Sequence, residues 1–458
     1  RKKSSGIQGL SNPDFGQEAY QLKKGFGDKE KSFVEIGYLK KDNDSIYNGG
    51  LNNVNSYDSY FLNSQIINDK KARLSIYLNQ NNLKSITENR EEKFLNTKII
   101  YHQKLFNNSF DSNLFFETNS GNLPQQEYTF LEVEPGLGTY KWIDINGNNI
   151  QELEEFEIAV FEDEGRYIRV LLPNQIFIRT YQNKLNYSLN INFLKLKKSD
   201  LGFYKFLSKI SNQFQYSLDK KTNLDINPEI EINPFNIDEN SLLAYNYSLK
   251  NVFYFNRSKQ KFSLAFTFLE NKLKNNFSFG STKSSSLMKK INFIHKIGDL
   301  YLIEVVGNKQ KKTNWSENFQ DKNYNINDYS INPKLTYYSG ENNRINFIYK
   351  LSNIDNSIGN QESLKQQNFG ISLFLNQKDK TGFISEFNYF KNEFEGDINS
   401  VISYIMMNGL QKGENYTWSF RLQRKLSKLI DINFVYLGRK SNNSRTIHNG
   451  SIQLKAIF

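Results

Sequence analysis

Three segments near the end of this sequence alternate between apolar and polar side chains. In residues 416–423, 430–436 and 451–458, every second residue is aromatic or aliphatic, and most residues between them are polar. A period of two places successive side chains on opposite faces of an extended chain, so each segment is expected to form a strand with one apolar and one polar face. Each segment has about 7–10 residues, which is close to the length of a tilted strand that crosses a bilayer.

The chain ends on Phe458, which falls on the apolar face of the last predicted strand. This ending resembles that of bacterial outer-membrane β-barrels, whose last strand closes with a C-terminal Phe that the assembly machinery reads. The resemblance implies that Phe458 is a barrel-closing signal and that the protein lies in the bacterial outer membrane.

The composition fits a barrel better than a disordered chain. The 458 residues include 37 Phe and 27 Tyr, although the mean hydropathy is low, at -0.65. Disordered chains contain few aromatic residues, whereas half of each barrel strand faces a polar lumen and aromatic girdles lie at both membrane interfaces. No run of about 18 apolar residues exists, so no transmembrane helix is predicted. The absence of Cys excludes disulfides and thiol catalysis.

The net charge of +11 does not predict a nucleic-acid partner, because the lysines are scattered along the chain and form no single basic face. The surplus charge could instead meet acidic lipid head groups. The expected partners are outer-membrane lipid and other envelope proteins.

The sequence predicts an all-β, antiparallel transmembrane barrel of roughly 16–20 strands. Gly, Pro and acidic residues break the alternation once, which predicts an insertion. The expected parts are a polar lead-in at 1–30, first barrel strands at 31–119, the insertion at 120–184 and the main barrel strands at 185–458. Residues 206–218 and 401–407 are among the predicted strands. A soluble β-sandwich or propeller is the alternative, but no repeat of about 40–50 residues supports a propeller, and 206–218 would be long for a soluble strand.

Barrels of this kind place short turns and both termini on the periplasmic side. Residues 426–429 are therefore expected to be periplasmic, and residues 408–415 and 438–450 extracellular. The first five residues precede no apolar segment and are no intact signal peptide, so the chain is expected to be processed or to be part of a longer protein.

The polar faces of the last three predicted strands carry mixed charges and amides. We expect them to face a lumen that is filled with water or packed with a plug and loops; the alternative is the solvated side of a soluble sheet. The predicted lumen-facing residues are Arg421, Gln423, Asp431, Asn433, Arg439, Gln453 and Lys455.

One short segment carries oxygen side chains at the spacing of a calcium loop. Calcium takes six to eight oxygen ligands, including backbone carbonyls. The candidate ligands, at positions 1, 3, 5, 7, 9 and 12, are Asp144, Asn146, Asn148, the carbonyl of Ile150, Glu152 and Glu155. The segment resembles the calcium loops of dockerin, EF-hand and integrin-type repeats, although positions 3 and 5 are Asn and position 6 is Asn149 instead of Gly. The predicted cofactor is structural calcium; the alternative is an Asn-rich turn.

The sequence predicts no enzyme. The three histidines, His102, His295 and His448, fall in different predicted strands. His448 lies near Ser444 and Ser451, which raises the possibility of an outer-membrane lipase, but no Asn or Asp follows at a convincing spacing. No glycine-rich nucleotide motif is present.

Two stretches are similar to large, mostly uncharacterised outer-membrane proteins of Bacteroidota: residues 135–157, and residues 408–448 together with Phe458. The resemblance implies that this chain is the C-terminal portion of a longer protein. The leading hypothesis is an integral outer-membrane barrel that acts as a channel or as the membrane scaffold of an envelope complex. The alternatives are a subunit of an outer-membrane assembly or secretion machine, and a secreted soluble β-rich adhesin.

Overall fold

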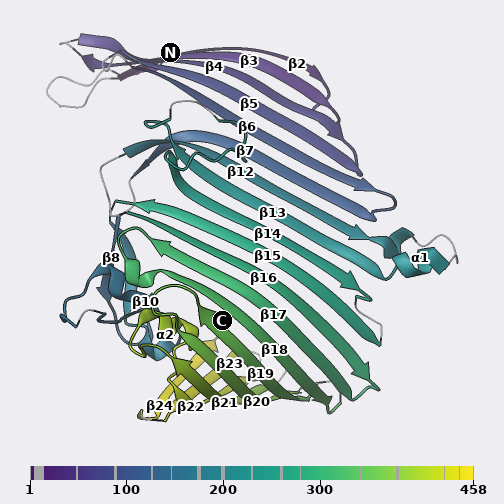
Figure 1. Ribbon diagram of the computed structural model, residues 1–458. Helices are drawn as coiled ribbons and strands as arrows, with labels where there is room; N and C mark the ends of the chain where they lie inside the picture. The colour runs from purple at the N-terminus through teal and green to yellow at the C-terminus, as the bar shows by residue number, and fades with distance from the viewer. Residues whose placement is uncertain are drawn as a thin grey trace. The chain divides into compact units, whose positions relative to one another are not determined.

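The chain folds almost entirely into antiparallel strands (Figure 1). The structure is a computed structural model that describes all residues except 1, 5–14, 48–49, 87–89, 125–126, 146, 173–176, 197–201, 228–230, 258–260, 279, 341, 378–380, 428, 443 and 457–458. Within the described residues, 20 strands are assigned to the main sheet and 4 to a small sheet. The predicted all-β, antiparallel class is therefore confirmed. Among the described helices, none is long and apolar enough to span a membrane.

The chain divides into two compact units, and β14 (Leu242–Phe255) contains a boundary between them. The strands of unit 1 pair antiparallel with their neighbours in chain order, from β2 to β7, and β7 then pairs with β12. The elements of unit 1 are β1 (Lys2–Ser4), β2 (Phe15–Gly27), β3 (Phe33–Tyr47), β4 (Gly50–Asn68), β5 (Ala72–Ser85), β6 (Arg90–Leu105), β7 (Phe110–Pro124), β12 (Phe177–Asn192), η3 (Phe193–Leu196), α1 (Gly202–Leu207) and β13 (Ile210–Asn223).

Unit 2 contains a second meander, in which each strand from β15 to β24 pairs antiparallel with the next. Its elements are β15 (Phe262–Phe277), β16 (Gly280–Ile297), β17 (Tyr301–Ser316), η4 (Gln320–Lys322), β18 (Tyr324–Tyr338), β19 (Arg344–Asn356), β20 (Ser363–Gln377), β21 (Thr381–Glu395), α2 (Val401–Met406), β22 (Gly413–Lys425), β23 (Ile430–Ser441) and β24 (Ile447–Ala456).

Unit 2 also contains a small folded insertion, residues 127–172, which follows β7 in the chain. Its sheet has the strand order β10–β9–β11–β8. The elements of the insertion are β8 (Glu127–Glu132), β9 (Tyr140–Trp142), η1 (Leu153–Glu155), β10 (Phe156–Ile158), η2 (Glu162–Glu164) and β11 (Tyr167–Leu172). Phe130 and Phe156 stack at 4.1 Å in its core, and Tyr167 packs edge-on against Phe156 at 4.9 Å.

The predicted strand at 401–407 is wrong, because this segment forms helix α2. The side chain of Ser400 caps the helix by accepting a hydrogen bond from the Ser403 N–H. Ile402 and Met406, which lie one turn apart, are buried in a cluster with Ile326, Ile354, Leu364 and Phe394. The apolar run therefore reflects the buried face of a short helix, which a period-two reading mistakes for a strand.

Three other predicted boundaries also change. The lead-in at 1–30 contains a strand, β2, which pairs with β3 from Gly27 and Phe33 onward. Glycines interrupt the apolar–polar alternation of β2, so the sequence pattern did not predict it. The predicted strand at 206–218 begins instead at Ile210, because Phe206 belongs to α1. The insertion is shorter than 120–184, since residues 120–124 of β7 pair with residues 177–181 of β12.

Candidate functional site

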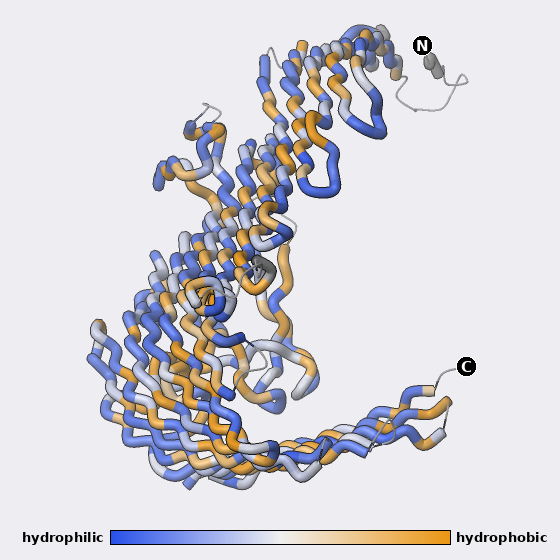
Figure 2. The backbone as a smooth tube through the Cα atoms, turned by 90° about the vertical axis from the view of Figure 1, so that its right-hand side faces the viewer, coloured by the Kyte–Doolittle hydropathy of each residue, from blue (hydrophilic) through white to orange (hydrophobic). Residues whose placement is uncertain are grey.

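The main sheet of unit 2 has one face that is apolar and exposed. Cross-strand partners share a face of a sheet, and one such row runs Phe266–Ile291–Gly307–Ile331–Leu351 across five strands. Figure 2 shows apolar and polar residues alternating along these strands. The exposed apolar side chains on this face include Phe262, Leu264, Phe266, Ile291, Phe293, Tyr301, Ile331, Leu335, Phe347, Phe369, Ile371, Phe387, Phe420, Ile430, Ile452 and Leu454. Soluble monomers rarely expose a continuous apolar patch of more than a few hundred Å², so this face requires an apolar environment.

Aromatic rings lie toward both ends of the apolar face. Four of them follow one another across β19 to β22: Tyr349 and Phe369 are 4.7 Å apart, Phe369 and Tyr389 6.4 Å, and Tyr389 and Tyr416 5.3 Å. Near the opposite strand ends, the rings of Tyr301 and Tyr337 are 5.4 Å apart. Aromatic residues at both borders of an apolar band are typical of transmembrane barrels.

Unit 1 has a similar exposed apolar face. Leu22 of β2 lies opposite Tyr38 of β3, which lies opposite Tyr60 of β4. Leu22 and Tyr60 are both exposed. The alternation that predicted two-faced strands is thus present in each unit.

The register places all seven predicted lumen-facing residues on the opposite, polar face of unit 2. Gln423 lies opposite Asn433, which lies opposite Gln453, and Asp431 lies opposite Lys455. Arg421 and Arg439 occupy the same face, opposite Val435 and Thr417. Arg421, Gln423 and Asn433 line a pocket of about 440 Å³ there. That this face lines a lumen stays a prediction.

Helix α2 packs on the polar face, at the end of the sheet where β17, β19, β21 and β23 finish. Its apolar side chains contact a patch made by Ile326, Ile354, Leu364 and Phe394. These four residues share the face of Arg439, because the register pairs Ile354 with Leu364 and Leu364 with Phe394. The connection between β21 and β22 therefore folds back over the polar face of the sheet.

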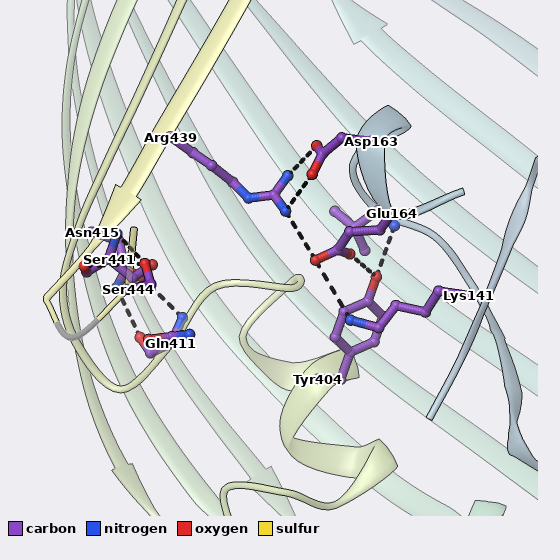
Figure 3. A network of polar contacts seen from close by, with 10 residues as sticks. Lys141, Asp163, Glu164, Tyr404, Gln411, Asn415, Arg439, Ser441 and Ser444 are labelled. Atoms are coloured by element: carbon purple, nitrogen blue, oxygen red, sulfur yellow. Dashed lines mark hydrogen bonds and ion pairs between the residues drawn. The ribbon is translucent and has the colours of Figure 1, made fainter. Parts of the chain in front are cut away.

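The insertion is held on the same face by an arginine clamp (Figure 3). The guanidinium of Arg439 donates to both carboxylate oxygens of Asp163, at 2.5 and 2.9 Å, and to Glu164 Oε1 at 3.1 Å. It also lies 3.9 Å from the ring centre of Phe161. Bidentate charge-assisted pairs of this kind are stronger and more specific in geometry than neutral hydrogen bonds.

Tyr404 of α2 joins the clamp (Figure 3). Its hydroxyl donates to Glu164 Oε2 at 2.9 Å and accepts from the Val160 N–H at 2.9 Å. Lys141 lies 3.5 Å from Glu164 and 4.3 Å from the centre of the Tyr404 ring. Burial, reinforced by the negative charge of Glu164, raises the pKa of Tyr404 above its ordinary value. The hydroxyl therefore stays protonated and able to donate at neutral pH.

A second polar network fixes the connections around the clamp (Figure 3). The fully buried side chain of Asn415 donates to Gln411 O at 2.8 Å and accepts from Ser441 Oγ at 2.6 Å. Gln411 belongs to the α2 connection and Ser441 ends β23. Asn415 thus ties the segment that carries Tyr404 to the strand that carries Arg439.

Further contacts hold the insertion at several points along the sheet. Lys322 of η4 pairs with Glu157 at 2.7 Å, and the ring of Tyr128 meets Phe277 of β15 at 5.3 Å. Eight inter-strand steps separate β15 from β23, which in a flat sheet would span about 38 Å. Because a four-stranded insertion contacts both, the sheet of unit 2 curves around it.

The structure places the candidate calcium ligands in hydrogen bonds within the loop. Asp144 accepts from the Gly147 and Asn149 N–H groups at 2.8 and 3.0 Å. Glu155 is fully buried and accepts from Trp142 Nε1 at 2.6 Å and from the Ile145 N–H at 3.1 Å. The two carboxylates thus already bind protein donors.

The other candidate ligands are dispersed around the same loop. Asn148 Oδ1 accepts from the Ile150 N–H at 2.7 Å, and the Glu152 N–H donates to Glu155 at 3.4 Å. Asn149 has a φ of 57°, the left-handed conformation expected at position 6. Asn146 lies outside the described residues. In the described part of the chain, no group of three or more His, Asp or Glu could hold a metal ion. Calcium binding stays a prediction.

The three histidines lie on three different strands, β6, β16 and β24. His448 Nδ1 is 2.7 Å from the Tyr436 hydroxyl, while Ser451 lies on the other face of β24. The hydroxyl of Ser444 donates to Ser441 O at 3.2 Å. The suggested lipase residues are therefore not brought together. The absence of enzymatic activity stays a prediction.

Sequence reasoning singled out Arg439 but missed its partners. Asp163 lies 276 residues away in the chain, and the only indication in the sequence was the crowding of acidic residues in the insertion. Phe458, the predicted barrel-closing signal, lies outside the described residues.

No protein-family model matches this sequence, and no curated protein matches it. Among solved structures, the chain is similar to the FrpB iron transporter from Neisseria meningitidis (F3-3 variant), at 12% identity over 93% of this chain and 68% of that chain, with a TM-score of 0.38. It is also similar to the ferric-catecholate import receptor Fiu from K12 E. coli, at 7% identity over 94% of this chain and 71% of that one, with a TM-score of 0.35. It is similar, too, to OmpT, an outer membrane protein of Vibrio cholerae, at 8% identity over 85% of this chain and 90% of that one, with a TM-score of 0.28. With identities and TM-scores this low, none of them assigns the chain to a family.

Proposed function

We propose that this chain is part of an integral β-barrel of the bacterial outer membrane. The observation that carries the proposal is the set of exposed apolar side chains that shares one face of a long antiparallel meander. Each large apolar side chain moved from water into an apolar medium contributes about 1.5–3 kcal/mol. Contact with lipid would therefore supply a large driving force, and the polar face would line the barrel interior.

Within the membrane, the barrel would act as a channel or as a scaffold for an envelope complex. The clamped insertion and α2 support a channel whose interior is filled at one end. Movement of the insertion away from Arg439 would open a path along the polar face. The connections at the end of the sheet that carries α2 and the insertion are long, and barrels place their longer connections outside the cell. This end would therefore face the cell exterior.

A second candidate is a subunit of an outer-membrane assembly or secretion machine. It is supported by the apolar side chains that the insertion exposes, which include Leu131, Leu137 and Ile158. Such side chains suit contact with another protein. Co-purification of a stoichiometric partner from native envelopes, lost on mutating Leu137 and Ile158 to Ser, would favour this candidate over a free-standing channel.

The membrane proposal can be tested with the protein's own tryptophans. Trp418 lies on the apolar face opposite Phe387, whereas Trp142 lies in the insertion and donates to Glu155. One variant keeps only Trp418 (Trp142→Phe with Trp315→Phe), and its matched control keeps only Trp142 (Trp315→Phe with Trp418→Phe). In vesicles of lipids with brominated acyl chains, Trp418 emission should be quenched strongly and Trp142 emission little.

Equal quenching of the two variants would contradict the proposed faces. A wild-type chain that stays monomeric and folded without detergent would overturn the membrane proposal and favour the soluble adhesin.

A further inference from the structure

The apolar face of unit 2 contains a groove centred on a glycine. Gly307 lies in the cross-strand row between Ile291 and Ile331, with Phe266 and Leu351 beyond them. A Cβ built on Gly307 meets no atom within 4 Å. These residues line a cavity of about 470 Å³. The missing side chain thus leaves a trough in a surface that is otherwise covered by apolar groups.

Lysines border this groove on the side nearer the insertion. In the next row of the register, Lys289 lies directly opposite Lys309, and Lys311 follows two residues later on the same face. All three are exposed, and Lys289 and Lys309 line the cavity. Like charges directly opposite each other destabilise a sheet. In the described part of the chain, none of the three forms an ion pair, although Lys309 lies 4.9 Å from the centre of the Tyr329 ring.

The boundary between apolar and charged side chains falls between these two rows. Toward the short turns, the same face of β17 carries Val305, Ile303 and Tyr301. Toward the insertion it carries Lys309 and Lys311. On a strand that crosses a membrane, lysines at such a boundary lie at the level of the lipid head groups.

Resting on the proposed membrane location, we propose that this groove binds one anionic, phosphate-bearing lipid of the surrounding membrane. One acyl chain lies over Gly307 between Ile291 and Ile331. The phosphate lies against the ammonium groups of Lys289, Lys309 and Lys311 and relieves their mutual repulsion. The combination of a trough for hydrocarbon and three adjacent positive charges matches a lipid better than a soluble anion, which would gain nothing from the apolar walls.

The test uses the full chain, and the probe is dioleoylphosphatidylglycerol, with the zwitterionic dioleoylphosphatidylcholine as the comparison lipid. Bound lipid is counted by native mass spectrometry after release from detergent micelles that contain each lipid. Wild type should retain one phosphatidylglycerol in preference to phosphatidylcholine. Neutralising Lys289 and Lys309 together, by K289Q with K309Q, should weaken phosphatidylglycerol retention about thirtyfold.

Two matched controls separate the groove from general charge. K365Q with K391Q removes two lysines from the same face outside the groove and should leave retention unchanged. G307L fills the trough and should reduce retention of both lipids. Gly382 also has open space around it but lies on the polar face, so G382L should leave retention of both lipids unchanged.

Equal phosphatidylglycerol retention by K289Q/K309Q and K365Q/K391Q, or by G307L and G382L, would overturn the lipid site. The membrane proposal would survive that result, because the tryptophan quenching in brominated vesicles tests it separately.

Discussion

Arg439 of β23 binds Asp163 of the insertion through two parallel hydrogen bonds of 2.5 and 2.9 Å, although 276 residues separate them in the chain. The side chain of Arg439 is only 13% exposed. The pair therefore places a charged contact between the sheet and the insertion where water has little access.

Replacing Arg439 with Ala should release the insertion from the sheet. Loss of one partner of a largely buried ion pair costs about 3–5 kcal/mol, because the other charge is left uncompensated. Amide hydrogen exchange in residues 127–172 should therefore rise at least about tenfold. The control is R421A, which removes an exposed arginine from the same face. Identical exchange in R421A and R439A would show that Arg439 does not hold the insertion.

If the polar face lines a channel, R439A should also conduct more ions than wild type in planar bilayers. The physical reason is that an insertion freed from β23 spends more time away from the polar face. Single-channel recordings of wild type, R421A and R439A provide the measurement. Conductance that is unchanged by R439A despite faster exchange would favour the scaffold role.

Replacing Tyr404 with Phe should weaken the clamp by about 1–3 kcal/mol, because the Val160 N–H and Glu164 both lose the hydroxyl. The effect should be visible as faster exchange of the Val160 amide, with the core of the sheet unchanged.

The clamp should also resist alkaline pH. The pKa of Tyr404 is raised in the folded protein, mainly by burial. The contribution of the Tyr404 hydroxyl to the stability of the clamp is therefore fully present below the tyrosine pKa of the unfolded chain, about 10. It is lost only as pH rises through the higher pKa of Tyr404 in the folded protein. Exchange in the insertion, corrected for its intrinsic pH dependence, should stay constant from about pH 7 to 9. A loosening within that range in wild type, absent from Y404F, would contradict the raised pKa.

Substitutions of Asp144 and Glu155 should change the response of the insertion to calcium in different ways. If calcium binds the loop, a concentration of about 100 times its Kd should stabilise the insertion by about 2.7 kcal/mol, and EGTA should reverse the effect. D144N should abolish this shift. E155Q should destabilise the insertion with or without calcium, since Glu155 accepts from Trp142 and Ile145. Thermal unfolding that is insensitive to both calcium and EGTA would remove the calcium hypothesis.

A lysine on the apolar face should impair membrane folding. Ile371 is exposed at the middle of β20, and a lysine at the bilayer midplane costs about 2–4 kcal/mol. Urea titrations in lipid vesicles should therefore show I371K less stable than wild type by that amount. Q423K, on the polar face, should differ from wild type by less than about 1 kcal/mol. A reversed order would mean that the two faces have been assigned the wrong way round.

The sequence alone determined the two faces of the strands, because alternation is a local property. Tyr416, Trp418 and Phe420 fall on one face of any extended chain, and Thr417, Ser419 and Arg421 fall on the other. The same rule failed at 401–407, where a short apolar run fits a buried helix as well as a strand. The burial of Ile402 and Met406 against four strands decided that case.

Only the tertiary structure decided which residues meet across the fold. No local pattern connects Arg439 with Asp163, or Tyr404 with Glu164, because their contacts depend on the packing of α2 against the polar face and on the position of the insertion over the sheet. The row that holds Gly307 likewise depends on the register of five strands. Side-chain alternation is fixed by backbone geometry within a few residues, whereas register and long-range pairing are fixed by the packing of the whole unit.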